Sequence, residues 1–322
     1  MKKTVILVLT LTVILVIAGC TDQTASGSKD IGIIQYVEHV ALDSARGGFV
    51  DALKDNGYVD GENITIDVQN AQADQSNLST ISDRFVSNDV DLVLAIATPA
   101  AQSIAGKTTE IPILGTAITD YVAAKLVESN EAPGGNVSGT TDMNPIKEQI
   151  DLLVKLVPDA QTVGVIYTSS EDNSIVQAAI AKEDIEALGL TYVEVTVTNS
   201  NDVQQATQSI VENCDAIYLP TDNVLASSMP IVNGVTMESK TPVICGESGM
   251  VANGGLATLG INYYDLGYMT GLMAIKVLEG EAEPATMPIE SAKEFDFAIN
   301  GAVARELGIE IPDDLSEYVI EY

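Results

Sequence analysis

The chain has 322 residues, of which 46% are hydrophobic and 5% aromatic, and this length suffices for two domains with buried cores. Asp and Glu number 46 against 15 Lys and Arg, which gives a formal net charge of −31. This imbalance excludes nucleic acid as a partner, because phosphate backbones are bound by basic residues. One histidine, His39, and three scattered cysteines cannot form a zinc site. The sequence has no phosphate-binding loop of the Walker or GxGxxG type, so we expect no metal and no cofactor.

The N-terminal segment predicts export and a lipid anchor. Two lysines precede an uncharged apolar stretch that is too short for a transmembrane helix. The stretch ends in Ile17-Ala18-Gly19-Cys20, which resembles the bacterial lipobox, in which the cysteine is acylated and becomes the mature N-terminus. We therefore expect a signal peptide over 1–19, lipidation of Cys20 and a flexible polar tether over 20–29. The protein would then lie outside the cytoplasm, held at the outer face of the cell membrane by lipid alone. An uncleaved anchor helix is the alternative.

From residue 30 the chain alternates short apolar segments with segments of helical periodicity, a pattern typical of parallel βαβ units. In the first half we predict strands over 31–37, 64–68, 92–96, 113–116 and 137–139, and helices over 42–57, 77–87 and from Thr98 onward. After Pro145 we predict strands over 163–167, 192–197, 216–219, 243–245, 256–260 and 295–299, and helices over 145–156, 173–188, 203–213, from Val224, 265–278 and 302–307.

This pattern predicts an α/β fold of two doubly wound parallel-sheet lobes joined by a multi-crossover hinge. We assign 30–142 plus 262–288 to the N-terminal lobe and 143–261 plus 289–322 to the C-terminal lobe. Because the chain passes between the lobes more than once, we expect them to close on a ligand by hinge bending.

Polar residues gather at the carboxyl ends of the predicted strands, where open α/β sheets bind ligands. The candidate ligand-binding residues are Gln35, Glu38, His39, Leu42, Thr98, Thr116, Ser169, Ser170, Asn173, Asp222, Asn223, Gly246 and Glu247. Most precede a helix, whose N-terminal amides favour an anion, while the acidic members can accept an ammonium group. This combination suits a zwitterionic ligand.

Within this set we expect Asp222 first and Glu38 second as the partner of a ligand ammonium. All three arginines lie within predicted helices and none at a strand end, so only Arg46, in the first turns of the first helix, could clamp a carboxylate. A ligand carboxylate is therefore expected to bind hydroxyls and amides around Thr98, Thr116, Ser169 and Ser170.

Helix capping is the alternative for the Ser, Asp and Asn residues, since these are common N-caps. His39 can equally be a structural hydrogen-bonding residue. Catalysis has no support, because no Ser-His-Asp order, paired carboxylates or GxSxG elbow is present. We therefore expect that the protein is not an enzyme.

Several segments resemble the TrpX-type substrate-binding proteins of ABC importers. They are Ile31–His39 with Leu42-Asp43, Ala97–Gln102, Gly139–Asp142, Tyr167–Glu171, Pro220–Asn223 and Gly246–Val251. The resemblance implies a type I periplasmic-binding-protein fold, a monomer that works with an ABC permease and its ATPase, and an aromatic L-amino acid (Trp, Tyr or Phe) as ligand. A branched-chain amino acid or a sugar is the alternative ligand, and an exported enzyme is the alternative class.

Overall fold

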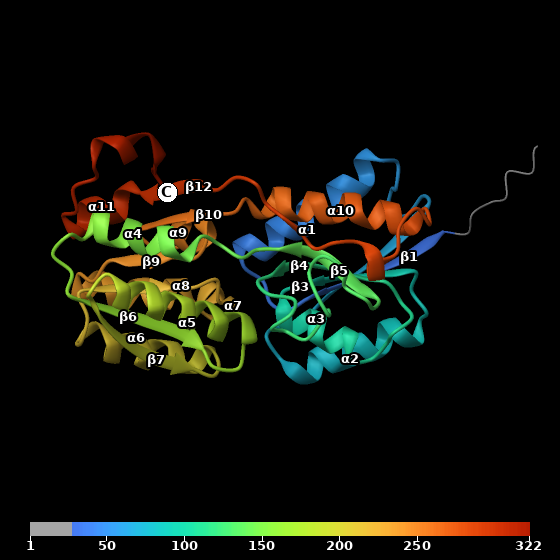
Figure 1. Ribbon diagram of the computed structural model, residues 1–322, viewed down its shortest axis with the longest axis horizontal. Helices are drawn as coiled ribbons and strands as arrows, with labels where there is room; N and C mark the ends of the chain where they lie inside the picture. The colour runs from blue at the N-terminus through green and yellow to red at the C-terminus, as the bar shows by residue number, and fades with distance from the viewer. Residues whose placement is uncertain (1–27) are drawn as a thin grey trace, which may run out of the picture.

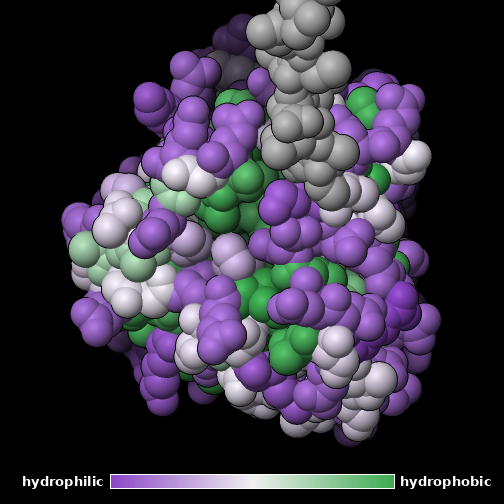
Figure 2. Space-filling model, turned by 90° about the vertical axis from the view of Figure 1, so that its right-hand side faces the viewer, coloured by the Kyte–Doolittle hydropathy of each residue, from purple (hydrophilic) through white to green (hydrophobic). Residues whose placement is uncertain are grey.

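The computed structural model describes residues 28–322, which form two α/β lobes (Figure 1). The predicted signal peptide, the lipidation site Cys20 and most of the tether lie outside the described residues. No helix within 28–322 has both the length and the apolar composition needed to cross a bilayer. Figure 2 shows the end of the N-terminal lobe, where hydrophilic residues dominate and apolar side chains occupy the recesses between them.

The N-terminal lobe is built on a six-stranded sheet in the order β11-β5-β4-β3-β1-β2, and all its pairs are parallel. Its strands are β1 (Lys29–Gln35), β2 (Ile64–Asn70), β3 (Leu92–Ile96), β4 (Ile113–Ile118), β5 (Val137–Thr141) and β11 (Glu290–Ser291). Its helices are α1 (Val40–Asp55), α2 (Gln75–Ser87), α3 (Thr98–Ala105) and α10 (Tyr263–Leu278), with a 3₁₀ turn at Pro284–Thr286. Strand β3 is buried along its whole length, because helices cover both faces of the sheet.

The C-terminal lobe has a seven-stranded sheet in the order β13-β12-β10-β9-β8-β6-β7. Its strands are β6 (Thr162–Thr168), β7 (Thr191–Val197), β8 (Ala216–Leu219), β9 (Val243–Cys245), β10 (Ala257–Gly260), β12 (Asp296–Asn300) and β13 (Val319–Ile320). Its helices are α4 (Ile146–Leu156), α5 (Asp172–Ala187), α6 (Val203–Val211), α7 (Asn223–Ser227), α8 (Met229–Ser239), α9 (Ser248–Ala252) and α11 (Gly301–Leu307), with 3₁₀ turns at Ser200–Asp202 and Asp313–Tyr318.

The predicted fold class, two α/β lobes with parallel sheets, is confirmed, with one antiparallel pair. Strand β12 runs antiparallel to β10, because it enters the sheet directly from the other lobe instead of after a covering helix. The predicted lobe boundary at residue 288 is wrong. Glu290 and Ser291 pair with β5, and Ile289 packs on the core of the N-terminal lobe. A two-residue strand carries no apolar run that the sequence could reveal.

Helix α10 packs against α1 by direct contact of the two backbones (Figure 1). A Cβ atom on Gly48 would lie 2.0 Å from the carbonyl oxygen of Tyr264, and one on Gly267 would lie 1.9 Å from that of Ala45. Only glycine permits this approach. The contact fixes α10, which follows most of the C-terminal lobe in sequence, onto the N-terminal lobe.

The adjacent glycines of α1 give a matched test of this contact. Gly48→Ala should lower the free energy of unfolding by about 2 kcal/mol, because its methyl group forces two backbones apart. Gly47→Ala should raise it by about 0.5–1 kcal/mol through helix propensity alone, since no atom lies within 4 Å of a Cβ built there. Urea denaturation of both variants measures the difference, and equal stabilities would contradict the close contact.

Candidate functional site

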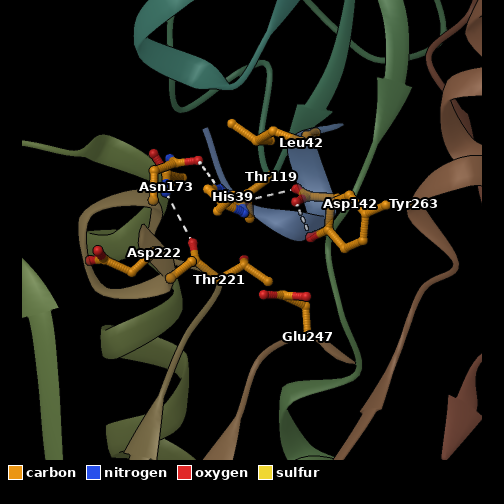
Figure 3. Close-up of a pocket in the computed structure, with 12 residues that line it drawn as sticks. His39, Leu42, Thr119, Asp142, Asn173, Thr221, Asp222, Glu247 and Tyr263 are labelled. Atoms are coloured by element: carbon orange, nitrogen blue, oxygen red, sulfur yellow. Dashed lines mark hydrogen bonds between the residues drawn. The ribbon is translucent and has the colours of Figure 1, made fainter. Parts of the chain in front are cut away.

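A cavity lies between the two lobes, and both lobes line it (Figure 3). Its lining consists of His39, Leu42, Ala117, Thr119, Asp142, Asn173, Thr221, Asp222, Asn223, Ala226, Glu247 and Tyr263. The cavity has a free volume of about 10 Å³. That free volume holds about one water, so a larger ligand can enter only when the lobes or the lining side chains move.

The lobes are closed around this cavity. Hydrogen bonds cross from one lobe to the other: Gln102 Nε2 to Asp172 Oδ2 (2.7 Å), Gln177 Nε2 to Thr119 Oγ1 (3.3 Å) and His39 Nε2 to Asn223 Oδ1 (3.4 Å). At the neighbouring contact of α1 with α9, a Cβ atom on Gly249 would lie 2.8 Å from the Cβ atom of Val40. Entry of a ligand therefore requires these contacts to break.

The backbone of the N-terminal lobe is strained at two strand ends, one of which lines the cavity. Ala97, directly after β3, has a φ angle of +80°, and Ala117, near the end of β4, has a φ angle of +56°. Non-glycine residues rarely adopt such angles, and those that do cluster at functional sites. At Ala117 the strain coincides with a shift in register between β4 and β5. This turn of the chain brings Thr119 into the lining.

Asp142 connects two of the segments that cross between the lobes. It follows β5, and its Oδ2 accepts a hydrogen bond from the hydroxyl of Tyr263 (2.6 Å), the first residue of α10. Its Oδ1 accepts one from Thr119 Oγ1 (3.0 Å), as Figure 3 shows. Burial raises the pKa of Asp142 above its usual value. The base of the cavity is thus a buried carboxyl group with both oxygens bonded.

Glu171 is buried behind the lining of the C-terminal lobe, between β6 and α5. Its Oε2 accepts hydrogen bonds from Nδ2 of Asn223 (2.5 Å) and Nδ2 of Asn173 (3.2 Å), and both asparagines line the cavity. Its Oε1 is buried without a hydrogen-bond partner. Burial, together with the nearby Asp222 carboxylate, raises the pKa of Glu171 well above its usual value.

Asp222 acts as the N-cap of α7 and ties that helix to β6. One carboxylate oxygen accepts from Leu225 N (2.9 Å) and Thr168 Oγ1 (2.8 Å), and the other from Thr168 N (2.6 Å). Both oxygens are therefore committed within the C-terminal lobe. The role of Asp222 as partner of a ligand ammonium stays a prediction, since it lines the cavity, while these contacts are the ones that helix capping predicts.

Six of the predicted site residues line the cavity: His39, Leu42, Asn173, Asp222, Asn223 and Glu247. The remaining seven do not: Gln35, Glu38, Thr98, Thr116, Ser169, Ser170 and Gly246. Glu38 is exposed. Gln35 is buried and supports the start of α1, since its Nε2 donates to Asp43 and its Oε1 accepts from Arg46. Arg46 thus donates its hydrogen bond to Gln35 and does not line the cavity.

None of the four hydroxyls expected to hold a ligand carboxylate, those of Thr98, Thr116, Ser169 and Ser170, belongs to the lining. Thr116 accepts a hydrogen bond from Thr140 in the lobe interior. Ser169 and Ser170 are exposed and bond to carbonyl oxygens at the end of β7. Thr98 is buried at the start of α3 and its hydroxyl has no hydrogen-bond partner.

Gly246 has a packing role. A Cβ atom there would lie 2.4 Å from the backbone nitrogen of Thr221, so glycine is needed where the two strand ends β8 and β9 approach.

Half of the lining residues were not predicted from the sequence: Ala117, Thr119, Asp142, Thr221, Ala226 and Tyr263. Alanines at a cavity wall carry no polar signal. Asp142 and Tyr263 meet only because the chain crosses between the lobes twice, which no local pattern shows. Glu171 was also missed, although it ends the polar segment that follows β6.

The lining carries carboxyl groups and neither lysine nor arginine. Burial raises the pKa of Glu247 to about 7, while its carboxylate accepts hydrogen bonds from Gly249 N and Met250 N at the start of α9. His39 supplies no charge at neutral pH, because burial lowers its pKa to about 4. A ligand that brings a positive group is favoured, since buried carboxylates are costly without a cation.

Comparison with known proteins gives consistent matches over the described chain. The family model for ABC transporter substrate binding proteins matches residues 30–322. A tyrosine-binding protein of Clostridioides difficile is 45% identical over 282 residues, which is 88% of this chain and 81% of that protein. The solved structure of an ABC domain from Streptococcus pneumoniae in complex with L-Trp has a TM-score of 0.88 at 39% identity, and the match covers 91% of this chain and all (100%) of that chain.

A third comparison bears on closure. The ligand-free, open structure of a substrate-binding protein with adhesive properties from Clostridium difficile is 47% identical, covering 91% of this chain and 99% of that chain, yet its TM-score is only 0.69. The L-Trp complex is less identical in sequence and superposes better. The present structure, whose lobes are closed, thus superposes better on the L-Trp complex than on the open, ligand-free structure.

The capping role of Asp222 predicts a large effect on stability. Asp222→Ala removes the acceptor of two backbone amides and one hydroxyl, so the free energy of unfolding should fall by about 3 kcal/mol. Asp159→Ala, at an exposed turn residue, should change it by less than about 0.5 kcal/mol. Chemical denaturation of both variants measures this. A loss of about 1 kcal/mol or less for Asp222→Ala would show that these bonds contribute little.

Proposed function

The chain belongs to the family of ABC transporter substrate-binding proteins, and we propose that the solute it captures is a free aromatic L-amino acid, held between its lobes. The proposed partners are an ABC permease and its ATPase, to which the protein delivers this solute. The role is binding and transfer without chemical change of the solute.

One observation carries the choice of ligand: the chain matches a tyrosine-binding protein over 88% of its own length, and its closed form superposes on a structure that holds L-Trp. The cavity chemistry supports the same choice. Its carboxyl groups suit the ammonium of an amino acid, and Leu42, Ala117, Ala226 and Tyr263 offer apolar contact to a ring. A neutral sugar would leave the buried carboxylates without a cation.

A ligand panel tests the proposal. L-Tyr, L-Trp or L-Phe should raise the melting temperature of the protein, and a ligand at a hundred times its Kd adds about 2.7 kcal/mol of stability. L-Leu, D-Tyr and ribose serve as controls and should give much smaller shifts. Because the chain contains no tryptophan, binding of L-Trp can be followed by its own fluorescence. Absence of any shift with all three aromatic amino acids at millimolar concentration would refute the proposal.

The finer localisation is also a proposal. The protein would be exported and anchored by lipid on Cys20, because an apolar stretch behind two lysines ends in Ala-Gly-Cys. The family match begins at residue 30, which leaves the preceding residues to serve as signal and tether. A lipid anchor would keep the binding protein close to its permease.

Membrane fractionation tests the anchor. Cys20→Ala should move the protein from the membrane fraction to the soluble fraction, because acylation requires the thiol. Cys214→Ala, at a half-buried free cysteine, should leave the protein in the membrane fraction. Full attachment of the Cys20→Ala variant would show that another segment holds the protein.

A further inference from the structure

We propose that Glu171 accepts the α-ammonium group of the ligand and makes the site selective for amino acids over their deaminated counterparts. This inference rests on the proposed function. Glu171 is 1% exposed and sits behind Asn173 and Asn223, on the face of the C-terminal lobe that closes against His39.

The orientation of the surrounding groups follows from the hydrogen bonds of Glu171. The Oε2 atom of Glu171 accepts from both asparagines, so Asn173 and Asn223 turn Nδ2 toward Glu171 and Oδ1 away from it. The Oδ1 atom of Asn223 then meets Nε2 of His39 at 3.4 Å. In this neutral imidazole Nε2 carries the proton, and Nδ1 is left as an acceptor.

This network ends in buried acceptors that lack donors. Glu171 Oε1, Asn173 Oδ1 and His39 Nδ1 are all buried without a hydrogen-bond partner. Asn173 is 5% exposed, so water cannot freely satisfy its oxygen. Unpaired buried acceptors are costly. An α-ammonium group offers three N–H donors and a positive charge, which is the chemistry that these atoms lack.

The other carboxyl groups at the cavity are already engaged. Both oxygens of Asp222 accept from Thr168, and one also accepts from Leu225. Asp142 is bonded on each oxygen, and so is Glu247. Of these three lining carboxyl groups and Glu171 behind them, only Glu171 keeps an oxygen without a donor.

The charge balance favours the same residue. Asp222 lies close enough to Glu171 to raise the pKa of that carboxyl group. Tyr36 lies near both carboxyl groups and is neutral, because burial raises the pKa of its hydroxyl. No lysine or arginine lines the cavity. An ammonium group would therefore supply the counter-charge that this pair of carboxyl groups lacks in the closed protein.

The test compares ligand pairs that differ only in the amino group: L-tyrosine with 3-(4-hydroxyphenyl)propanoate, and L-tryptophan with indole-3-propanoate. We expect titration calorimetry to show, for at least one pair, that the Kd of the wild-type protein for the amino acid is lower than its Kd for the deaminated counterpart by a factor of about thirty or more. Glu171→Gln keeps an acceptor for both asparagines. This variant should bind the amino acid about thirtyfold or more weakly than the wild type, and it should bind the deaminated counterpart as tightly as the wild type or more tightly.

Glu183→Gln is the matched control, because it removes the same charge from an exposed position of the same helix, α5. It should bind both members of each pair as the wild type does. Thermal melts establish that each variant is folded.

The outcomes separate this inference from the proposed function. If the wild type binds neither amino acid, the proposed function fails. If it binds an amino acid and the deaminated counterpart equally well, the role of Glu171 is overturned, whether or not the variant folds. If Glu171→Gln weakens both members of a pair by the same factor, Glu171 only positions the lobe, and the inference is overturned too.

Discussion

Closure of this protein places carboxyl groups between two lobes with no lysine or arginine among the lining residues. Moving such groups out of water is unfavourable unless each has donors or a cation. Asp142, Asp222 and Glu247 have donors from the protein itself. Glu171 is only half satisfied. The position of the lobes therefore depends on the charge of what lies between them as well as on its shape.

The fold could be predicted because the central strands β3, β4, β8 and β9 are buried along their whole length and read as short apolar runs. Strands β3, β8 and β9 have the predicted bounds, since turn residues flank them closely. Elements without such a run were missed. Strand β11 has two exposed residues, and α9 has five residues that follow a strand directly. Their positions depend on the neighbouring lobe segments, which local sequence does not encode.

The site was harder to predict, because polar residues at strand ends have two roles that look alike in sequence. Asp222 and Glu247 both cap helices, and both also line the cavity. Thr116 and Thr119 lie three residues apart at the end of β4, on either side of the strained residue Ala117. The side chain of Thr116 stays in the lobe interior, whereas that of Thr119 lines the cavity. Only the folded backbone distinguishes these cases.

The contact between α1 and α10 also determines the order in which the protein can fold. The N-terminal lobe lacks its covering helix until residue 278 has emerged from a ribosome or a translocation channel, and the sheet of the C-terminal lobe lacks β12 until residue 300. Neither lobe can be completed before most of the other lobe has been synthesised, because the segment that completes it comes later in the sequence. Neither lobe is one continuous stretch of chain, so neither can reach its final form until the segments that complete it, near the end of the sequence, have been made.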